Sequence, residues 1–122
     1  MPSGFSSNEW YALHRKGAKM VKLFHAGAVS PGILKSMLGV TPLGKQIRIM
    51  PSGGVSPANA QDWWDAGAVV VGMGSNLVGG EIDHAPGSDK FEAAARQWAE
   101  GGKAAAQEVF DRAKARAERL AV

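Results

Sequence analysis

Residues 67–73 read G-A-V-V-V-G-M, in which a glycine and an alanine precede a stretch without a polar side chain. A short apolar run of this kind is typical of a strand that is buried on both faces of a parallel sheet. The helix before it is expected to start at Ser56-Pro57, with serine as N-cap and proline at the first helical position, and to run to about Ala66. The stretch therefore predicts a helix that ends at a glycine and is followed by a parallel strand.

A similar unit occurs nearer the N-terminus. Ser6 and Glu9 have the spacing of a capping box, so a helix is expected over residues 9–16. Gly17 ends this helix, and the run M-V-K-L-F at 20–24 is expected to form the next strand. The chain thus repeats a capped helix, a glycine stop and a short apolar strand.

Another helix and strand lie between these two units. A helix is expected from Ser30 through Leu38, and residues 46–50 are expected to form a strand that ends at Pro51. Strands that alternate with helices indicate an α/β fold with a parallel sheet, in which the carboxyl ends of the strands meet at one edge. Ligands bind at this edge in such folds, so the residues that follow each strand are the candidates for function.

The last third of the chain has a different pattern. Residues 1–80 are expected to form the βα units, and residues 81–122 a polar loop, which holds His84, and a long C-terminal helical segment. We expect Gly101-Gly102 to break or kink this segment. Basic and acidic residues alternate along it, which is typical of a solvated helix face and indicates no nucleic-acid partner.

The composition is that of an average soluble globular protein, with 45% hydrophobic and 20% charged residues among 122. No apolar run approaches the roughly 18 residues of a membrane helix, and no signal peptide is recognisable, so we expect a cytoplasmic protein without a membrane partner. The absence of cysteine excludes disulfides and thiolate nucleophiles. No histidine and carboxylate have metal-ligand spacing, so neither a metal nor a cofactor is expected.

Lys22 is the one charged residue in the apolar run at 20–24. Lysine is almost never fully buried without a partner or a chemical role. On a strand it shares a face with Met20 and Phe24, and apolar neighbours favour the neutral amine that attacks a ketone. Lys22 is therefore either the partner of a carboxylate or a nucleophile, and His25, at the carboxyl end of the same strand, either lines the pocket or is incidental.

Two glycine-rich turns follow the other strands. Residues 51–55 read P-S-G-G-V and residues 72–75 read G-M-G-S, and each turn leads into a helix. Glycine lets the main chain approach an anion closely, and a helix N-terminus adds unpaired N–H donors. The two turns together predict a phosphate-binding site, although either turn alone is also what a simple tight turn requires.

Several stretches together resemble the C-terminal half of the 2-keto-3-deoxy-6-phosphogluconate / 2-keto-3-deoxy-6-phosphogalactonate aldolase family. They are E-W-Y-A-L-H-R-K-G-A-K-M-V-K-L-F at 9–24, H-A-G at 25–27, S-P-G-I-L-K-S-M at 30–37, P-S-G-G-V-S-P-A-N at 51–59 and A-G-A-V-V-V-G-M-G-S-N-L at 66–77. The resemblance covers about residues 4–78. It implies strands six to eight of a (β/α)8 TIM barrel in a class I, Schiff-base aldolase that is a homo-oligomer, a trimer in the family.

The resemblance also implies roles for particular residues. Lys22 would form the Schiff base in a lyase that cleaves a phosphorylated keto-deoxy sugar acid to pyruvate and glyceraldehyde 3-phosphate. Ser52 would stand where the family discriminates between epimeric sugar acids. The substrate phosphate would be held by Gly53, Gly54, Gly74 and Ser75.

The sequence departs from the family pattern in two ways. His25 replaces the proline of the family's K-x-F-P-A motif, which adds a titratable group beside the carbonyl chemistry. Nothing matches the family's upstream segment, which holds its general acid–base glutamate and a nearby arginine, and Met1 is expected at the end of the fifth strand. Two alternatives therefore stand beside the aldolase: a catalytically impaired remnant that binds phosphorylated metabolites, or a structural, partner-binding fragment.

Three parallel strands form an open sheet with exposed edges. We expect this sheet to be covered in one of four ways: by another chain, by a domain-swapped or multi-copy barrel, by the C-terminal helix, or by an upstream half.

Overall fold

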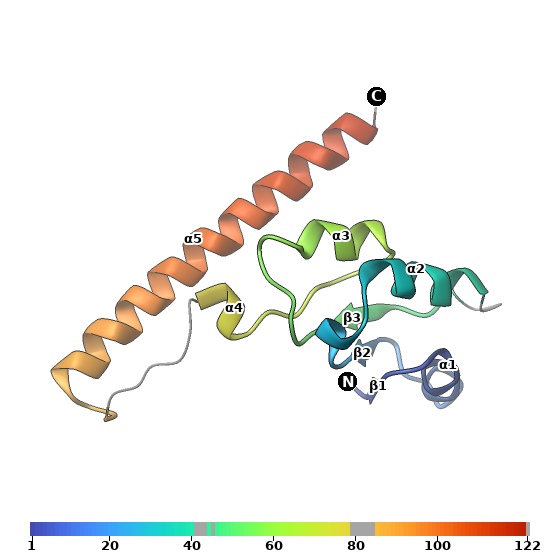
Figure 1. Cartoon of the computed structure of the whole chain (residues 1–122), viewed down its shortest axis with the longest axis horizontal. Coiled ribbons are helices and arrows are strands. Elements are labelled where there is room, and N and C mark those ends of the chain that lie inside the picture. Colours follow the sequence, from blue (N-terminus) through green and yellow to red (C-terminus); the bar gives the residue numbers. More distant parts are fainter. Residues whose placement is uncertain (41–43, 45, 79–84, 122) are drawn as a thin grey trace. The chain divides into compact units, whose positions relative to one another are not determined.

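The computed structural model describes residues 1–40, 44, 46–78 and 85–121, so that His84 and the rest of the segment 81–84 lie outside the described residues. Two compact units, residues 1–73 and 74–122, are described separately. The elements in chain order (Figure 1) are β1 (Ser3–Gly4), α1 (Ser7–Arg15), β2 (Val21–Leu23), the 3-10 turn η1 (Ala26–Ala28), α2 (Pro31–Val40), β3 (Ile49–Pro51), α3 (Ala60–Asp65), α4 (Ser75–Val78) and α5 (Asp89–Leu120).

The first unit is built on a parallel sheet with the strand order β1-β2-β3. Lys22 on the central strand is in register with Ser3 on one side and Met50 on the other. The expected α/β fold with parallel strands is therefore confirmed. β1 has only two residues, which is too short to produce a recognisable alternation in the sequence.

The stretch at 69–73 differs from its prediction as a buried strand. A single parallel bridge joins Ser52 to Gly72, and the N–H of Val69 donates to the Ile49 carbonyl at 3.1 Å. Val69 and Val70 keep 49% and 41% of their surface exposed. The prediction of burial on both faces was wrong because, within residues 1–73 as described, this segment pairs with β3 alone and its other side has no neighbouring strand.

The core lies on one side of the sheet. Val21 and Leu23 of β2 are buried, whereas Lys22 between them is half-buried, as alternation along a strand requires. The same cluster contains a large buried side chain from each of the three helices α1, α2 and α3, namely Trp10, Leu34 and Trp63. Lys22 is therefore directed to the face of the sheet that the core does not occupy.

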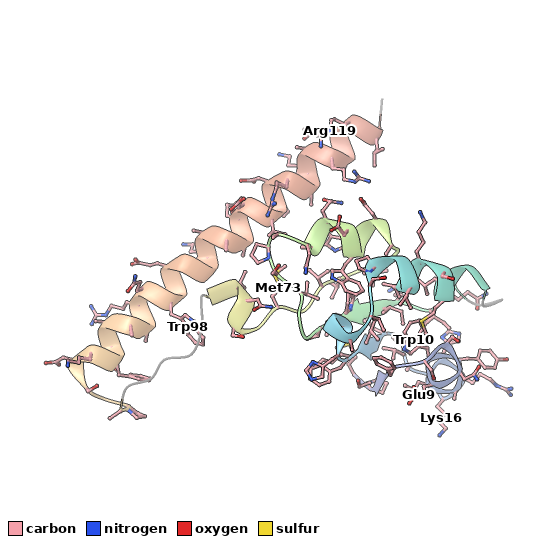
Figure 2. The ribbon with its side chains drawn as sticks, in the orientation of Figure 1. Glu9, Trp10, Lys16, Met73, Trp98 and Arg119 are labelled. Carbon is pink, nitrogen blue, oxygen red and sulfur yellow. The ribbon has the colours of Figure 1, made fainter. Side chains whose placement is uncertain are left out.

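The start of α1 is a complete capping box, as predicted. The Ser6 hydroxyl accepts the N–H of Glu9, and the Glu9 carboxylate accepts the N–H groups of Ser6 and Phe5 at 2.7 and 2.9 Å. The indole N–H of Trp10 donates to the Gly4 carbonyl at 2.9 Å and ties α1 to β1. Figure 2 shows Trp10 on the inner side of α1, with Lys16 pointing away.

The capping box predicts a pH dependence of stability. The hydrogen bonds from Ser6 and Phe5 lower the pKa of Glu9 below its ordinary value of 4.5. A depressed carboxyl pKa stabilises the fold above the ordinary value, and this contribution is lost as the pH falls through the lower, folded value. We expect Glu9→Gln to lower the urea midpoint near neutral pH and to have a smaller effect at about pH 3. An equal effect at both pH values would contradict this role for the carboxylate.

Two helices differ from their predictions. The regular part of α3 starts at Ala60 rather than at Ser56, although the N–H groups of Asn59 and Ala60 already bond the Ser56 carbonyl. In the second unit, α5 runs without a break from Asp89 to Leu120 through Gly101-Gly102. Two helical glycines cost about 2 kcal/mol, which the alanine-rich turns on both sides offset.

The second unit consists of α4 and α5, which pack against each other. The Ser88 hydroxyl caps α5 by accepting the N–H of Phe91 at 3.1 Å. Among the described helices, none is both long and apolar enough to span a bilayer. The structure divides the chain at residues 73 and 74, whereas the sequence pattern placed the boundary at 80 and 81, so the turn that contains Gly74 belongs with the helical unit.

Candidate functional site

Lys22 lies on the central strand of the sheet, on the face opposite the core. The Ser3 hydroxyl donates to the Lys22 carbonyl at 3.1 Å, which holds the backbone at this position. The Lys22 Nζ lies 4.7 Å from the centre of the Phe24 ring, within the range of a cation–π contact. The amine is therefore held beside an aromatic ring at the carboxyl end of β2.

No carboxylate in the described residues makes an ion pair with Lys22. The Glu9 carboxylate is occupied by the capping box. The sequence left two interpretations of Lys22, the partner of a carboxylate or a nucleophile. The described residues provide no carboxylate partner for the first interpretation.

His25 follows Phe24 and stacks on it. The centres of the two rings are 3.6 Å apart, and the ring planes meet at 34°. A β-carbon placed on Gly53 would lie 2.6 Å from His25 Nδ1 and 3.1 Å from Phe24 Cε2, so the imidazole lies directly against the glycine. The structure thus brings together Lys22, Phe24, His25 and Gly53, of which Phe24 was not predicted as a site residue.

The turn at Gly53-Gly54 is locked to the loop after β2 by its backbone. Both glycines have positive φ angles, +80° and +86°, which side chains of L-residues rarely allow. The Gly27 N–H donates to the Gly53 carbonyl at 2.6 Å, and a β-carbon on Gly54 would lie 2.8 Å from the Gly27 Cα. Within the described chain the N–H groups of Gly53 and Gly54 donate to no protein acceptor.

Asn59 braces the same turn through a contact with Gly54 that was not predicted from the sequence. Its Oδ1 accepts the Ser56 N–H at 2.9 Å, and its Nδ2 donates to the Gly54 carbonyl at 3.1 Å. The sequence does signal the bond to Ser56, because Asn59 lies three residues after it, and the side chain at this position of a capping box reaches back to the N-cap backbone. The amide thus connects the start of the helical turn to the glycine turn.

Ser52 lies on the same side of the sheet as Lys22, because residues 50 and 52 alternate with the buried Ile49 and Pro51. A β-carbon on Gly72 would be only 3.1 Å from the Ser52 Cβ and Oγ. Gly72 therefore leaves room for the Ser52 side chain, a second contact that the sequence did not reveal.

Gly74 and Ser75 stand at the start of α4, in the second unit. Both residues are exposed, and the N–H of Leu77 donates to the Gly74 carbonyl at 2.8 Å. Since the two units are described separately, a phosphate site that combines Gly53-Gly54 with Gly74-Ser75 stays a prediction. In the described parts of the chain, no group of three or more His, Asp or Glu side chains could together hold a metal ion.

The lock between the two loops can be tested by stability. We expect Gly54→Ala to lower the free energy of unfolding by about 2 kcal/mol or more, because alanine is strained at this φ and its β-carbon meets the Gly27 backbone. Gly39→Ala is the matched control, since Gly39 is helical with open space around it and alanine favours helices. Urea unfolding measures both, and equal stabilities for the two variants would contradict the lock.

The sequence profile of a family described as KDPG and KHG aldolase matches residues 7–93. The chain belongs to this aldolase family. The match covers both loops of the candidate site and confirms the resemblance found in the sequence.

Within the aligned region, about a third of the residues are identical between this chain and curated members of the KDPG and KHG aldolase family. The chain is 33% identical over 76 residues to the 2-dehydro-3-deoxy-6-phosphogalactonate aldolase of Escherichia coli, a match to 62% of this chain and 36% of that protein. It is 34% identical over 87 residues to the KHG/KDPG aldolase of Escherichia coli, a match to 71% of this chain and 40% of the relative. The chain therefore spans about two-fifths of the length of these aldolases.

Solved structures agree with the family. A structure of native KDPGal superposes with a TM-score of 0.62 at 29% identity, over 90% of this chain and 48% of the other. A designed cube-shaped, porous protein cage made by fusing symmetric oligomeric domains has a TM-score of 0.70 at 27% identity, over 98% of this chain and 41% of the other. The chain is thus an α/β member of an enzyme family of the lyase class.

Proposed function

We propose that Lys22 is the Schiff-base lysine of a class I aldolase that cleaves a 2-keto-3-deoxy-6-phospho sugar acid. The observation that carries the proposal is the grouping of Lys22, His25 and Gly53 at the carboxyl ends of two adjacent parallel strands. Membership of the aldolase family supports it. In this proposal β2, β3 and the segment at 69–72 are strands six to eight of a (β/α)8 barrel.

The chemistry needs an amine that attacks the substrate's keto carbon. The carbinolamine that forms loses water to give an iminium, which withdraws electrons from the adjacent bonds. Cleavage of the bond between C3 and C4 releases glyceraldehyde 3-phosphate, and the electron pair remains on the Lys22-bound fragment as an enamine. A proton added at C3 and hydrolysis of the iminium then release pyruvate and restore the amine.

His25 is our candidate for the proton transfers. Within the described residues its imidazole lies against the ring that contacts the Lys22 amine, and no carboxylate pairs with that amine. An imidazole gives and takes protons near neutral pH. In the forward reaction His25 accepts the proton of the C4 hydroxyl as the bond breaks and returns a proton to C3 of the enamine.

The phosphate is proposed to bind to the free N–H groups of Gly53 and Gly54. Their positive φ angles and the absence of a side chain allow an oxyanion to approach the backbone. Gly74 and Ser75 would complete the site, and Ser52 would contact a hydroxyl group that differs between epimeric sugar acids. The symmetric oligomeric domains of the similar designed cage favour a homo-oligomer, a trimer in the proposed form.

Reductive trapping tests the proposal. Pyruvate and borohydride should convert the iminium to a stable secondary amine, and peptide mapping should locate it on Lys22. No adduct in a folded sample would overturn the aldolase assignment.

A second candidate function is binding of phosphorylated metabolites without cleavage. It is favoured by the absence of an ion-paired carboxylate at Lys22 in the described chain. Phosphate binding without an adduct would identify such a remnant. Loss of both would instead favour a structural or partner-binding role.

A further inference from the structure

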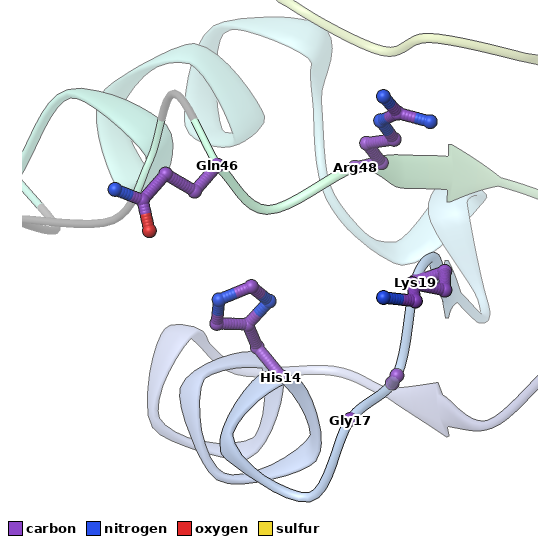
Figure 3. Close-up of a pocket in the computed structure, with 6 residues that line it drawn as sticks. His14, Gly17, Lys19, Gln46 and Arg48 are labelled. Carbon is purple, nitrogen blue, oxygen red and sulfur yellow. The ribbon is translucent and has the colours of Figure 1, made fainter.

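A hollow lies at the opposite end of the strands from Phe24, His25 and the glycine turn. It has a volume of about 280 Å³ and is lined by His14, Gly17, Ala18, Lys19, Gln46 and Arg48 (Figure 3). Lys19 precedes β2 and Arg48 precedes β3, so the hollow opens at the amino-terminal edge of the sheet. Its residues are separate from those of the proposed aldolase site.

The end of α1 shapes this hollow. Gly17 has a φ of +91°, and the N–H groups of Gly17 and Ala18 bond the carbonyls of His14 and Leu13 at 2.9 and 3.1 Å. The last turn of the helix is therefore closed by its own backbone, and these carbonyls are less available to repel an incoming anion. The chain then turns directly into the segment that carries Lys19.

The charge of the hollow is one-sided. His14, Lys19 and Arg48 all line it, and its lining contains no carboxylate. Figure 3 shows the amine of Lys19 directed toward the His14 ring, whereas the guanidinium of Arg48 points away from that ring. None of the three side chains has an ion pair or hydrogen bond to another described residue. Basic groups gathered without a counter-charge attract anions.

The size of the hollow indicates a small ligand. A volume near 280 Å³ lies just below the usual range for small-molecule sites, about 300–1,000 Å³, so the hollow is too small to enclose a whole nucleotide. Arginine and lysine bind phosphate and carboxylate oxygens with charge-assisted hydrogen bonds, and the Gln46 amide adds a further donor. We propose that this hollow binds a small polyanion that bears phosphate or carboxylate groups.

The test uses the full chain and follows backbone amide signals by NMR during titration with inorganic phosphate, with citrate and with neutral glucose. We expect either or both anions to shift the signals of residues 14–19 and 46–48, and glucose to shift none. Phosphate alone would identify a phosphate site, and citrate alone a polycarboxylate site. Shifts confined to Gly53 and Gly54 would locate anion binding in the proposed aldolase site instead and would overturn this inference.

Two double variants with the same change in net charge complete the test. Lys19→Gln with Arg48→Gln removes two basic groups from the hollow and should weaken anion binding there about tenfold or more. Arg15→Gln with Lys16→Gln removes two basic groups from the same end of α1 outside the lining and should leave the affinity unchanged. Equal weakening in both variants, or no localised shift up to about 10 mM anion, would overturn the inference. Circular dichroism verifies that both variants fold.

Discussion

On the proposed function, Lys22→Met is expected to abolish the pyruvate adduct that borohydride should trap on this protein. Methionine has a similar length and replaces the cation–π contact with Phe24 by an apolar one, but it has no amine to attack a ketone. Mass spectrometry of the intact protein should show complete loss of the adduct. Lys22→Arg should lose it as well, because a guanidinium stays protonated.

Lys35→Met is the matched control for this experiment. Lys35 lies on α2, away from the sheet face that carries Lys22, and its replacement removes one amine of the same type. The adduct should form as in the unchanged protein. If Lys22→Met still carries an adduct at the original level, another amine is the nucleophile and the role of Lys22 is wrong.

His25→Gln is expected to slow the exchange of the pyruvate methyl protons with solvent deuterium by about 10²–10⁴-fold. This exchange requires a group that removes a proton from C3 of the iminium and returns one to the enamine. Glutamine approximates the size of histidine and can donate a hydrogen bond, but it cannot exchange protons near neutral pH. The rate is measured by the loss of the methyl signal in the NMR spectrum.

Two further measurements separate proton transfer from a structural effect. His25→Gln should still form the borohydride adduct on Lys22, since the amine is unchanged, and free imidazole should restore part of the exchange rate in His25→Ala. His84→Gln removes a histidine from another part of the sequence and should leave the rate unchanged. An unchanged rate in His25→Gln, with the adduct present, would rule out His25 while the Schiff base remained supported.

Local signals accounted for the elements that were predicted correctly. The capping box at Ser6 and Glu9 and the helix start at Ser30 depend on side chains within one turn of the helix they start. The parallel arrangement followed from the alternation of helices and apolar strands. Because these features depend on residues that are close together in the sequence, they could be predicted from the sequence alone.

The features that were missed depend on residues far apart in the chain. The exposure of Val69 and Val70 depends on whether a further strand lies beside them, which a run of valines does not reveal. The contact between Gly27 and Gly54 joins two loops, and the Phe24–His25 pair is placed against Gly53 only by the register of β2 and β3. The clustering around Lys22 could be proposed from strand order, but its contacts required the structure.

The backbone contact between Gly27 and Gly54 limits how this protein can be redesigned. Because a β-carbon on Gly54 would lie 2.8 Å from the Gly27 Cα, a library that varies position 54 should yield few folded members, whereas a β-carbon on Gly27 would make only ordinary contacts of 3.4 Å or more. Ser52 and His25 carry their side chains beside this contact without forming it. A library on these two loops would therefore do best to diversify positions 25 and 52 and keep Gly54 constant.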